Sequence, residues 1–300
     1  MAMIEVEHLT RRYGTTTAIE GLGFQVERGE IVGFLGPNGA GKSTTMRILC
    51  GSLGATSGTA RVAGFDVAEQ PAEVKQRIGY LPEHPPLYTE MTVEQYLVFC
   101  ARLKGVDTPR EAAVNAAERV GLSPVSHRII GNLSKGFRQR VGIAQALVHE
   151  PEVLVLDEPN SGLDPAQRAE IRALIEQLAA GDTTVLLSTH VLPEIEALCD
   201  RVIILNQGRI VAQDTVAALG SSEHRIRIEV ERPSEALASS LQALAGVHEV
   251  KALGDGMYLL RTNGDQRAVI ARCAVEAGLL HLGTDRRLED VFLRLTGGME

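Results

Sequence analysis

The chain has 300 residues, of which 44% are hydrophobic and 23% charged, with a formal net charge of −8. This composition excludes a largely disordered chain and predicts one large folded domain or two smaller ones. The acidic balance and the absence of a dense Lys/Arg stretch exclude nucleic acid as the main partner. The four cysteines are widely spaced and form no CxxC pair, which favours free thiols over a disulfide framework or a zinc site.

The sequence also bears on membrane insertion and secretion. No apolar run approaches the roughly 20 residues that a membrane-spanning helix needs. The N-terminal residues lack the cationic start and apolar block of a secretory signal. We therefore expect a cytoplasmic protein, whose contact with a membrane would depend on a partner.

The first fifty residues predict two strands ahead of a strand–loop–helix unit. Alternating apolar and acidic residues over 3–9 indicate a half-exposed antiparallel strand, and a short apolar stretch follows at 24–26. The apolar run over 30–35 is typical of a buried strand. It leads into a glycine-rich loop over 36–41 and a helical stretch over 42–49.

The middle of the chain predicts helices and then buried strands. Periodicity from 92 to 120 is helical, and another helix is expected over 139–149. The uniformly apolar runs 153–156 and 184–187 are typical of parallel strands covered on both faces. Between them, Asp164 followed by Pro165 predicts a helix start and Gly181 its end. Strands separated by helices predict an α/β core with a mainly parallel sheet.

The pattern changes after about residue 218, where Gly220-Ser221-Ser222 predicts a linker. Over 224–282 the expected order is strand, helix, strand, strand, helix, strand, which matches the ferredoxin-like arrangement. We therefore expect two domains, a nucleotide-binding domain over 1–218 and a small α+β accessory domain over 219–300.

One motif predicts a phosphate site. It fits G-x-x-x-x-G-K-[ST] and consists of Gly36, Pro37, Asn38, Gly39, Ala40, Gly41, Lys42, Ser43 and Thr44. Its glycines let consecutive main-chain N–H groups turn toward an anion, and the following helix adds the positive end of its dipole. In this motif the lysine reaches the β- and γ-phosphates and the Ser43 hydroxyl reaches Mg²⁺.

A second motif places carboxylates at the end of a buried strand. The run 153–156 is followed by Asp157, Glu158 and Pro159. Ligands of open α/β sheets collect at the carboxyl ends of strands. We therefore expect Asp157 to hold Mg²⁺ and Glu158 to polarise an attacking water. Taken alone, two adjacent acids after a strand are more often a solvated turn than a functional site.

Together these motifs resemble the nucleotide-binding subunit of ATP-binding cassette (ABC) transporters over residues 3–217. Leu133-Ser134-Lys135-Gly136-Phe137 is similar to the LSGGQ signature of that family, and Ser161-Gly162-Leu163-Asp164 matches its D-loop. Tyr13 matches the aromatic residue that stacks on adenine, with a core tyrosine as the alternative. His190 follows a strand as the switch histidine of the family does.

The resemblance implies a P-loop NTPase fold of ABC type, with an antiparallel β subdomain and a helical subdomain at about 84–150. It implies ATP and Mg²⁺ as cofactors, with Glu158 and His190 as catalytic residues. It adds Tyr13, Ser134, Lys135, Gly136 and Asp164 to the nucleotide-binding residues of the motif. Ser43, Asp157 and Glu83 are the implied metal ligands.

Two departures affect what the resemblance implies. Glu83 stands where the family usually has glutamine; its carboxylate can still bind Mg²⁺ or water, but its charge bears on coupling to the membrane subunit. Lys135 and Phe137 replace Gly and Gln of the common signature, whereas Ser134 and Gly136 are kept.

The resemblance also implies partners. Two cassettes stack head to tail, so we expect a homodimer, bound through separate permease subunits to the cytoplasmic face of the membrane. The single cassette, Glu83 and the extra C-terminal domain are most similar to ABC-2-type exporters, which include drug-resistance and gliding-motility ATPases. Alternatives are a non-transport ABC ATPase with a nucleotide-gated regulatory or assembly role, a P-loop kinase, and a binding module with little hydrolysis.

Overall fold

The computed structural model describes residues 2–221, 224–284 and 292. By its internal contacts the chain divides into two units, one ending at Asp214 and the other beginning at Thr215. None of the helices in the described ranges is long and apolar enough to cross a membrane.

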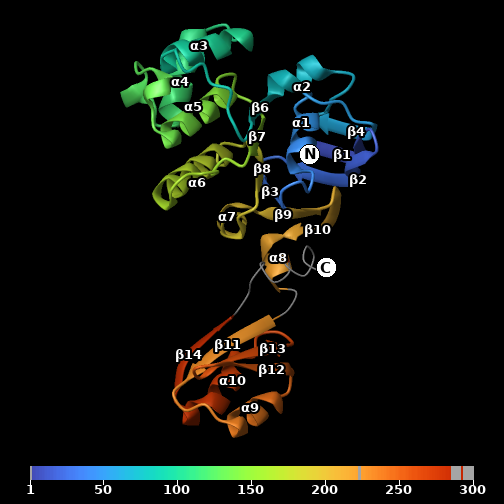
Figure 1. Cartoon of the computed structure of the whole chain (residues 1–300), viewed down its shortest axis with the longest axis vertical. Coiled ribbons are helices and arrows are strands. Elements are labelled where there is room, and N and C mark those ends of the chain that lie inside the picture. The colour runs from blue at the N-terminus through green and yellow to red at the C-terminus, as the bar shows by residue number, and fades with distance from the viewer. Residues whose placement is uncertain (1, 222–223, 285–291, 293–300) are drawn as a thin grey trace. The chain divides into compact units, whose positions relative to one another are not determined.

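A six-stranded sheet forms the centre of the first unit, in the order β10-β9-β3-β8-β7-β6 (Figure 1). Its strands are β3 (Ile31–Leu35), β6 (Ile78–Leu81), β7 (Val153–Asp157), β8 (Thr184–Thr189), β9 (Arg201–Asn206) and β10 (Arg209–Thr215). Neighbouring strands from β9 to β6 run parallel, and every residue of β3, β7 and β8 is buried. The predicted buried parallel strands are thereby confirmed, and their carboxyl ends lie at one edge of the sheet.

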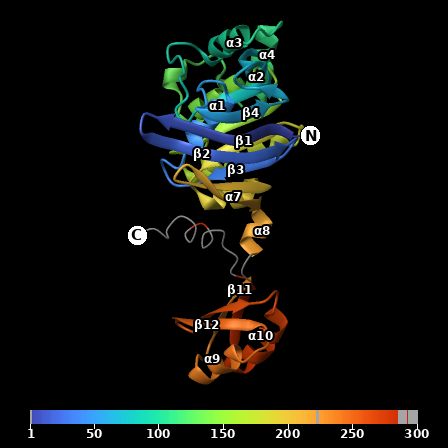
Figure 2. The ribbon, with the colours of Figure 1, turned by 90° about the vertical axis from the view of Figure 1, so that its right-hand side faces the viewer.

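An antiparallel sheet lies beside the central one, in the order β2-β1-β4-β5 (Figure 2). It contains β1 (Ala2–Tyr13), β2 (Thr16–Glu27), β4 (Ser57–Val62) and β5 (Phe65–Asp66). The predicted strands over 3–9 and 24–26 were too short. Irregular register steps between β1 and β2 let one long hairpin form, although they interrupt the alternation on which the prediction depended.

Helices α1 (Lys42–Leu49) and α2 (Pro71–Arg77) belong to this part of the unit, whereas α3 (Val93–Leu103), α4 (Pro109–Arg119) and α5 (Lys135–Leu147) gather near β6 (Figure 1). The helical periodicity predicted from 92 to 120 is confirmed as two helices, α3 and α4, because the chain turns at Gly105, whose φ is +72°. The helix expected over 139–149 begins earlier, since the Ser134 side chain caps it by accepting from Phe137 N.

The remaining helices of the first unit flank β8. Helix α6 (Pro165–Ala179) begins where predicted, because Asp164 Oδ1 accepts from Gln167 N at 2.9 Å and a proline follows the cap. Helix α7 (Leu192–Leu198) packs on β3 at Gly33, where a Cβ would collide with Ile195 and Cys199. These contacts cover one face of β3, whose residues are all buried.

A joint connects the three-helix group to the rest of the unit. Lys104, at the C-terminal end of α3, donates from Nζ to the main-chain oxygens of Lys75 (2.6 Å) and Ile78 (3.3 Å). His149, just beyond α5, places Nε2 3.2 Å from Lys104 Nζ and 3.0 Å from Ile78 O. Burial lowers the pKa of Lys104. We call these two side chains and two carbonyls the Lys104 joint.

The joint predicts acid sensitivity. Burial and the Lys104 ammonium lower the pKa of His149 from 6.5 to about 4, against the raising effect of the Ile78 carbonyl. The unfolded chain therefore binds a proton at higher pH than the folded chain, and the free energy of unfolding falls as the pH drops from about 6.5 to about 4. The other titratable groups at the joint are Lys75, Cys50 and Cys100.

Thermal melts across that pH window check this expectation. His149→Gln keeps an acceptor for Lys104 but does not titrate. Between pH 6.5 and 4 its Tm is expected to fall by several degrees less than that of the natural chain. His248→Gln, at an exposed position of the second unit, serves as the control and is expected to change nothing. Equal acid slopes in the His149→Gln variant and the natural chain would refute the assignment.

The second unit contains α8 (Val216–Ser221), β11 (His224–Val230), α9 (Glu235–Gln242), β12 (Val247–Gly254), β13 (Met257–Thr262), α10 (Arg267–Ala274) and β14 (Leu279–Thr284). Its antiparallel sheet has the order β12-β13-β11-β14, which is the ferredoxin-like arrangement. Both α9 and α10 contribute to one core with Ile226, Ile228 and Val230. The predicted linker is corrected in part: Gly220 and Ser221 end α8, and Ser222 lies outside the described residues.

Candidate active site

A pocket of about 490 Å³ opens where the parallel strands end, and we call it the P-loop pocket. It brings together most of the predicted phosphate motif with two acidic side chains and a histidine. Its lining is Ala18, Asn38, Gly39, Ala40, Gly41, Lys42, Ser43, Thr44, Glu83, Glu158, Ser161 and His190.

The loop before α1 has a backbone that demands glycine. Gly41 has φ +103°, and a Cβ there would meet the Ile19 side chain and Ala18 O. Thr45 Oγ1 donates to Gly41 O at 2.9 Å, which ties the loop to the first turn of α1. The start of α1 therefore lines the pocket next to a loop that only glycine can form, as an anion site at a helix N-terminus requires.

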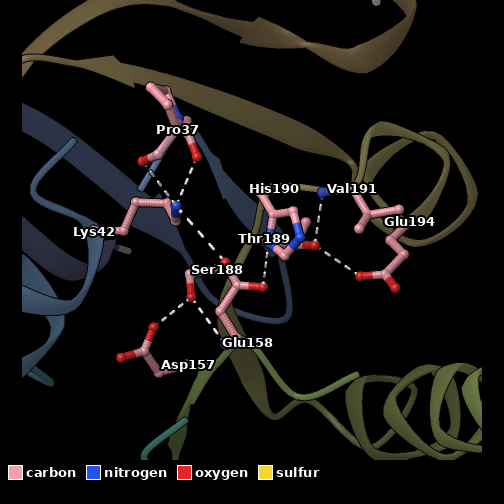
Figure 3. A network of polar contacts seen from close by, with 10 residues as sticks. Pro37, Lys42, Asp157, Glu158, Ser188, Thr189, His190, Val191 and Glu194 are labelled. Carbon is pink, nitrogen blue, oxygen red and sulfur yellow. Dashed lines mark hydrogen bonds and ion pairs between the residues drawn. The ribbon is translucent and has the colours of Figure 1, made fainter. Parts of the chain in front are cut away.

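Lys42 is nearly buried, at 6% exposure. Its Nζ donates to Gly36 O at 2.6 Å and to Pro37 O at 3.3 Å (Figure 3). The same ammonium lies 3.7 Å from Glu158 Oε1. The loop thus holds the cation at the mouth of the anion site, where a phosphate can replace the weaker contacts.

Glu158 connects Lys42 to His190. Its Oε2 lies 3.0 Å from His190 Nδ1, which donates to the carboxylate when protonated (Figure 3). Glu158 has φ +49°, a left-handed conformation that side chains rarely adopt. The three side chains follow β3, β7 and β8 respectively, so the parallel sheet brings them together.

Asp157 lies behind this row and is 3% exposed. Ser188 Oγ, from β8, donates to Asp157 Oδ1 at 2.6 Å and accepts from Glu158 N at 3.0 Å. Thr189 Oγ1 donates to Glu194 Oε2 at 2.8 Å and accepts from Val191 N, which shapes the turn that carries His190. Two hydroxyls of β8 therefore orient the acidic strand end and the histidine.

The other predicted nucleotide residues do not line the P-loop pocket. Ser134 and Gly136 line a separate pocket of about 250 Å³ with Phe137, Arg140, Gln167, Glu170 and Ile171, which we call the α5 pocket. Lys135 lies against Gly162 of the predicted D-loop. Asp164 caps α6. One chain therefore does not bring the signature residues to its own phosphate motif.

Tyr13 is at the end of β1, 46% exposed, with the Arg11 guanidinium 4.6 Å from its ring centroid. The alternative interpretation of Tyr13 as a core residue is therefore wrong. Glu83, just after β6, is exposed and does line the P-loop pocket.

Known proteins resemble this chain along nearly its whole length. A family model described as ABC transporter matches residues 19–161. The linearmycin resistance ATP-binding protein LnrL of Bacillus subtilis is 34% identical over 98% of both chains. The Nod factor export ATP-binding protein I of Burkholderia orbicola is 36% identical over 99% of this chain and 98% of its own.

A solved structure gives the same result for the fold. That of cbiO1 from Clostridium perfringens, part of an ABC transporter complex, covers 74% of this chain and 91% of its own, with a TM-score of 0.67 and 30% identity. The chain belongs to the ATP-binding subunits of ABC transporters. It is an ATPase with the P-loop NTPase fold of that family.

In this ABC subunit, sequence reasoning missed several residues around the site. Ala18 lines the P-loop pocket beside Ser161 of the predicted D-loop, and Ser188 joins Asp157 to the main chain of Glu158. Gln139 Nε2, in α5, donates to Pro159 O at 2.8 Å. The available signal was the polar end of the apolar strand before His190, where serine and threonine stand together.

Replacement of Ser188 by alanine in this ABC subunit is expected to lower both stability and turnover. The buried Asp157 Oδ1 would lose its hydroxyl donor, a loss of about 1–3 kcal/mol in the free energy of unfolding. Thermal melts and ATPase assays check this. Ser52→Ala, which removes an exposed hydroxyl bonded to Arg47 O, is the matched control. Unchanged Tm and turnover in Ser188→Ala would contradict the role.

Proposed function

We propose that the P-loop pocket binds the triphosphate of ATP and that Glu158 and His190 carry out its hydrolysis. The observation that supports this most strongly is the Lys42–Glu158–His190 row. A nearly buried ammonium lies beside an anion site, and 3.7 Å away a carboxylate contacts an imidazole. Phosphate charge partner, base and orienting group thus lie in one pocket.

The chemistry follows from these positions. Water attacks the γ-phosphorus in line with the leaving oxygen, and the negative charge spreads over the equatorial oxygens. Lys42 and the α1 amides stabilise that charge. Glu158 accepts the proton of the water, while His190 holds Glu158 and the water in orientation. Tyr13 offers an exposed ring to the adenine.

The donor atoms near the pocket suit Mg²⁺. Within the described residues, no group of three or more His, Cys, Asp or Glu side chains could hold a metal by itself. Mg²⁺ commonly keeps water ligands and binds through one or two carboxylates plus substrate phosphates. We assign Ser43, Asp157 and Glu83 as its oxygen donors. The ion would neutralise charge on the β- and γ-phosphates.

We further propose that two copies complete the site. The α5 pocket, with Ser134 and Gly136, is separate from the P-loop pocket of the same chain. In a head-to-tail pair, each chain would supply Ser134, Lys135 and Gly136 to the γ-phosphate held by the other, with Asp164 at the contact between them. The exposed start of α5, capped by Ser134, leaves main-chain amides for this contact.

The third part of the proposal is an exporter. The B. subtilis and Burkholderia relatives are named for linearmycin resistance and for Nod factor export. Tyr88 is 51% exposed, and its ring lies 5.5 Å from Phe99 and 6.0 Å from Tyr96. Tyr88, which packs on α3 through these rings, would contact the cytoplasmic loops of a separate permease, and the permease would hold the subunit at the cytoplasmic face of the membrane.

Affinity purification of the tagged full chain from detergent-solubilised membranes tests the proposal. Co-purification of a polytopic membrane protein, together with phosphate release that needs no acceptor substrate, is expected. An ATPase recovered only from the soluble fraction, without any membrane protein, would instead support the non-transport alternative.

A further inference from the structure

The Lys104 joint holds a partly buried cation whose contacts, among the described residues, are main-chain oxygens and an imidazole. Lys104 Nζ donates to two main-chain oxygens and lies 3.2 Å from His149 Nε2. Burying a charge away from water is unfavourable unless its donors are satisfied. Two donors of the ammonium reach main-chain oxygens, and His149 Nε2 lies 3.2 Å from Nζ and 3.0 Å from Ile78 O. These contacts fix the direction of the Lys104 side chain.

The acceptors belong to the core of the unit, and the side chains to the three-helix group. Lys75 O lies in the last turn of α2, and Ile78 O at the first residue of β6. Lys104 ends α3, and His149 follows α5. The chain leaves β6 at its other end, Leu81, two residues before Glu83 in the P-loop pocket. The joint therefore connects the helical group to the strand that leads into the pocket.

Helix α5 extends from the Lys104 joint to the signature residues, so a small tilt at the joint moves those residues further. It has 13 residues, which gives a length of about 20 Å. Its far end carries Ser134 and Gly136. A tilt of about 10° at the joint would displace that end by roughly 3 Å. Misplacement of a group by 1 Å can change a reaction rate by about 10²-fold.

We propose that Lys104 and His149 are positioning residues that fix the orientation of the three-helix group relative to Ile78. They thereby determine the position at which the start of α5 meets the second cassette. This inference rests on the two-chain site under Proposed function. Neither side chain touches the P-loop pocket, so the ATP affinity of a single chain does not depend on them, whereas turnover in the paired state does.

The test compares variants of the full chain. Lys104→Met keeps the stem and removes the ammonium; it is expected to leave the ATP affinity within about twofold and to lower kcat on the order of tenfold. His149→Gln keeps an acceptor and is expected to hydrolyse ATP at nearly the natural rate. Lys251→Met, in the second unit, is the matched control. If Lys104→Met lowers affinity and leaves kcat unchanged, the proposal fails.

A distance measurement distinguishes a role of Lys104 in positioning the three-helix group from a role in stability alone. Spin labels at Val114→Cys, on α4, and Ser57→Cys, on β4, in a Cys273→Ser background report the position of the helical group. Lys104→Met is expected to broaden their distance distribution and His149→Gln to leave it narrow. If Lys104→Met lowers the Tm but changes neither the distance distribution nor kcat per folded molecule, the positioning role is refuted.

Two further outcomes are distinguishable. Should Lys104→Met fail to fold, His149→Leu, which removes one acceptor only, is expected to give the same broadening; a narrow distribution there would refute the inference. If the natural chain neither binds nor hydrolyses ATP, the proposed function fails. The label distances still report whether Lys104 and His149 hold the three-helix group in place.

Discussion

Replacement of Glu158 by glutamine is expected to leave ATP binding intact and to slow hydrolysis by about 10²-fold or more, the usual effect of losing a general base. The amide has nearly the shape of the carboxylate but cannot accept a proton from water. It also removes the negative charge 3.7 Å from Lys42, so the ammonium becomes free for the phosphates. Calorimetry measures binding, and phosphate release measures turnover.

The control for this experiment is Glu111→Gln, an exposed position on α4 that does not line the P-loop pocket. It is expected to bind and hydrolyse ATP as the natural chain does. ATPase activity of Glu158→Gln close to that of the natural chain would remove Glu158 from the reaction and leave His190, its contact at 3.0 Å, as the candidate base.

Replacement of Lys42 by alanine should weaken ATP binding by about a hundredfold or more. Hydrogen bonds to charged groups contribute about 1.5–3 kcal/mol each, and Lys42 is the only lysine or arginine lining the P-loop pocket among the described residues. The change also leaves the 8%-exposed Glu158 carboxylate in the pocket without its ammonium, where it would repel the phosphates.

Calorimetric titration with ATP checks this, with Lys251→Ala in the second unit as control. Because Lys42 Nζ also donates to Gly36 O and Pro37 O, a thermal melt without nucleotide must accompany it. Undiminished ATP affinity in a folded Lys42→Ala variant would mean that the pocket does not bind the triphosphate through this lysine.

Features confined to neighbouring residues could be predicted from the sequence. The strand, loop and helix over 31–49 follow from an apolar run, glycines and a helix-forming stretch in direct succession. The cap at Asp164 depends on residues within one turn. The ferredoxin-like order after residue 224 follows from alternation and turn residues. Prediction was poorer where local cues were weak, as in β4, α2 and β6.

Other properties depended on which strands lie side by side. Lys42, Glu158 and His190 are far apart in the chain, and only the order β3-β8-β7 brings them into one pocket. Ser188 acquires its role because β8 pairs with β7, which places its hydroxyl beside Asp157. The separation of Ser134 from the P-loop pocket and the Lys104 joint likewise arise from packing. The sequence by itself determined the chemical groups and their local turns, whereas the tertiary structure decided which groups meet, because contacts between distant segments depend on strand order and register.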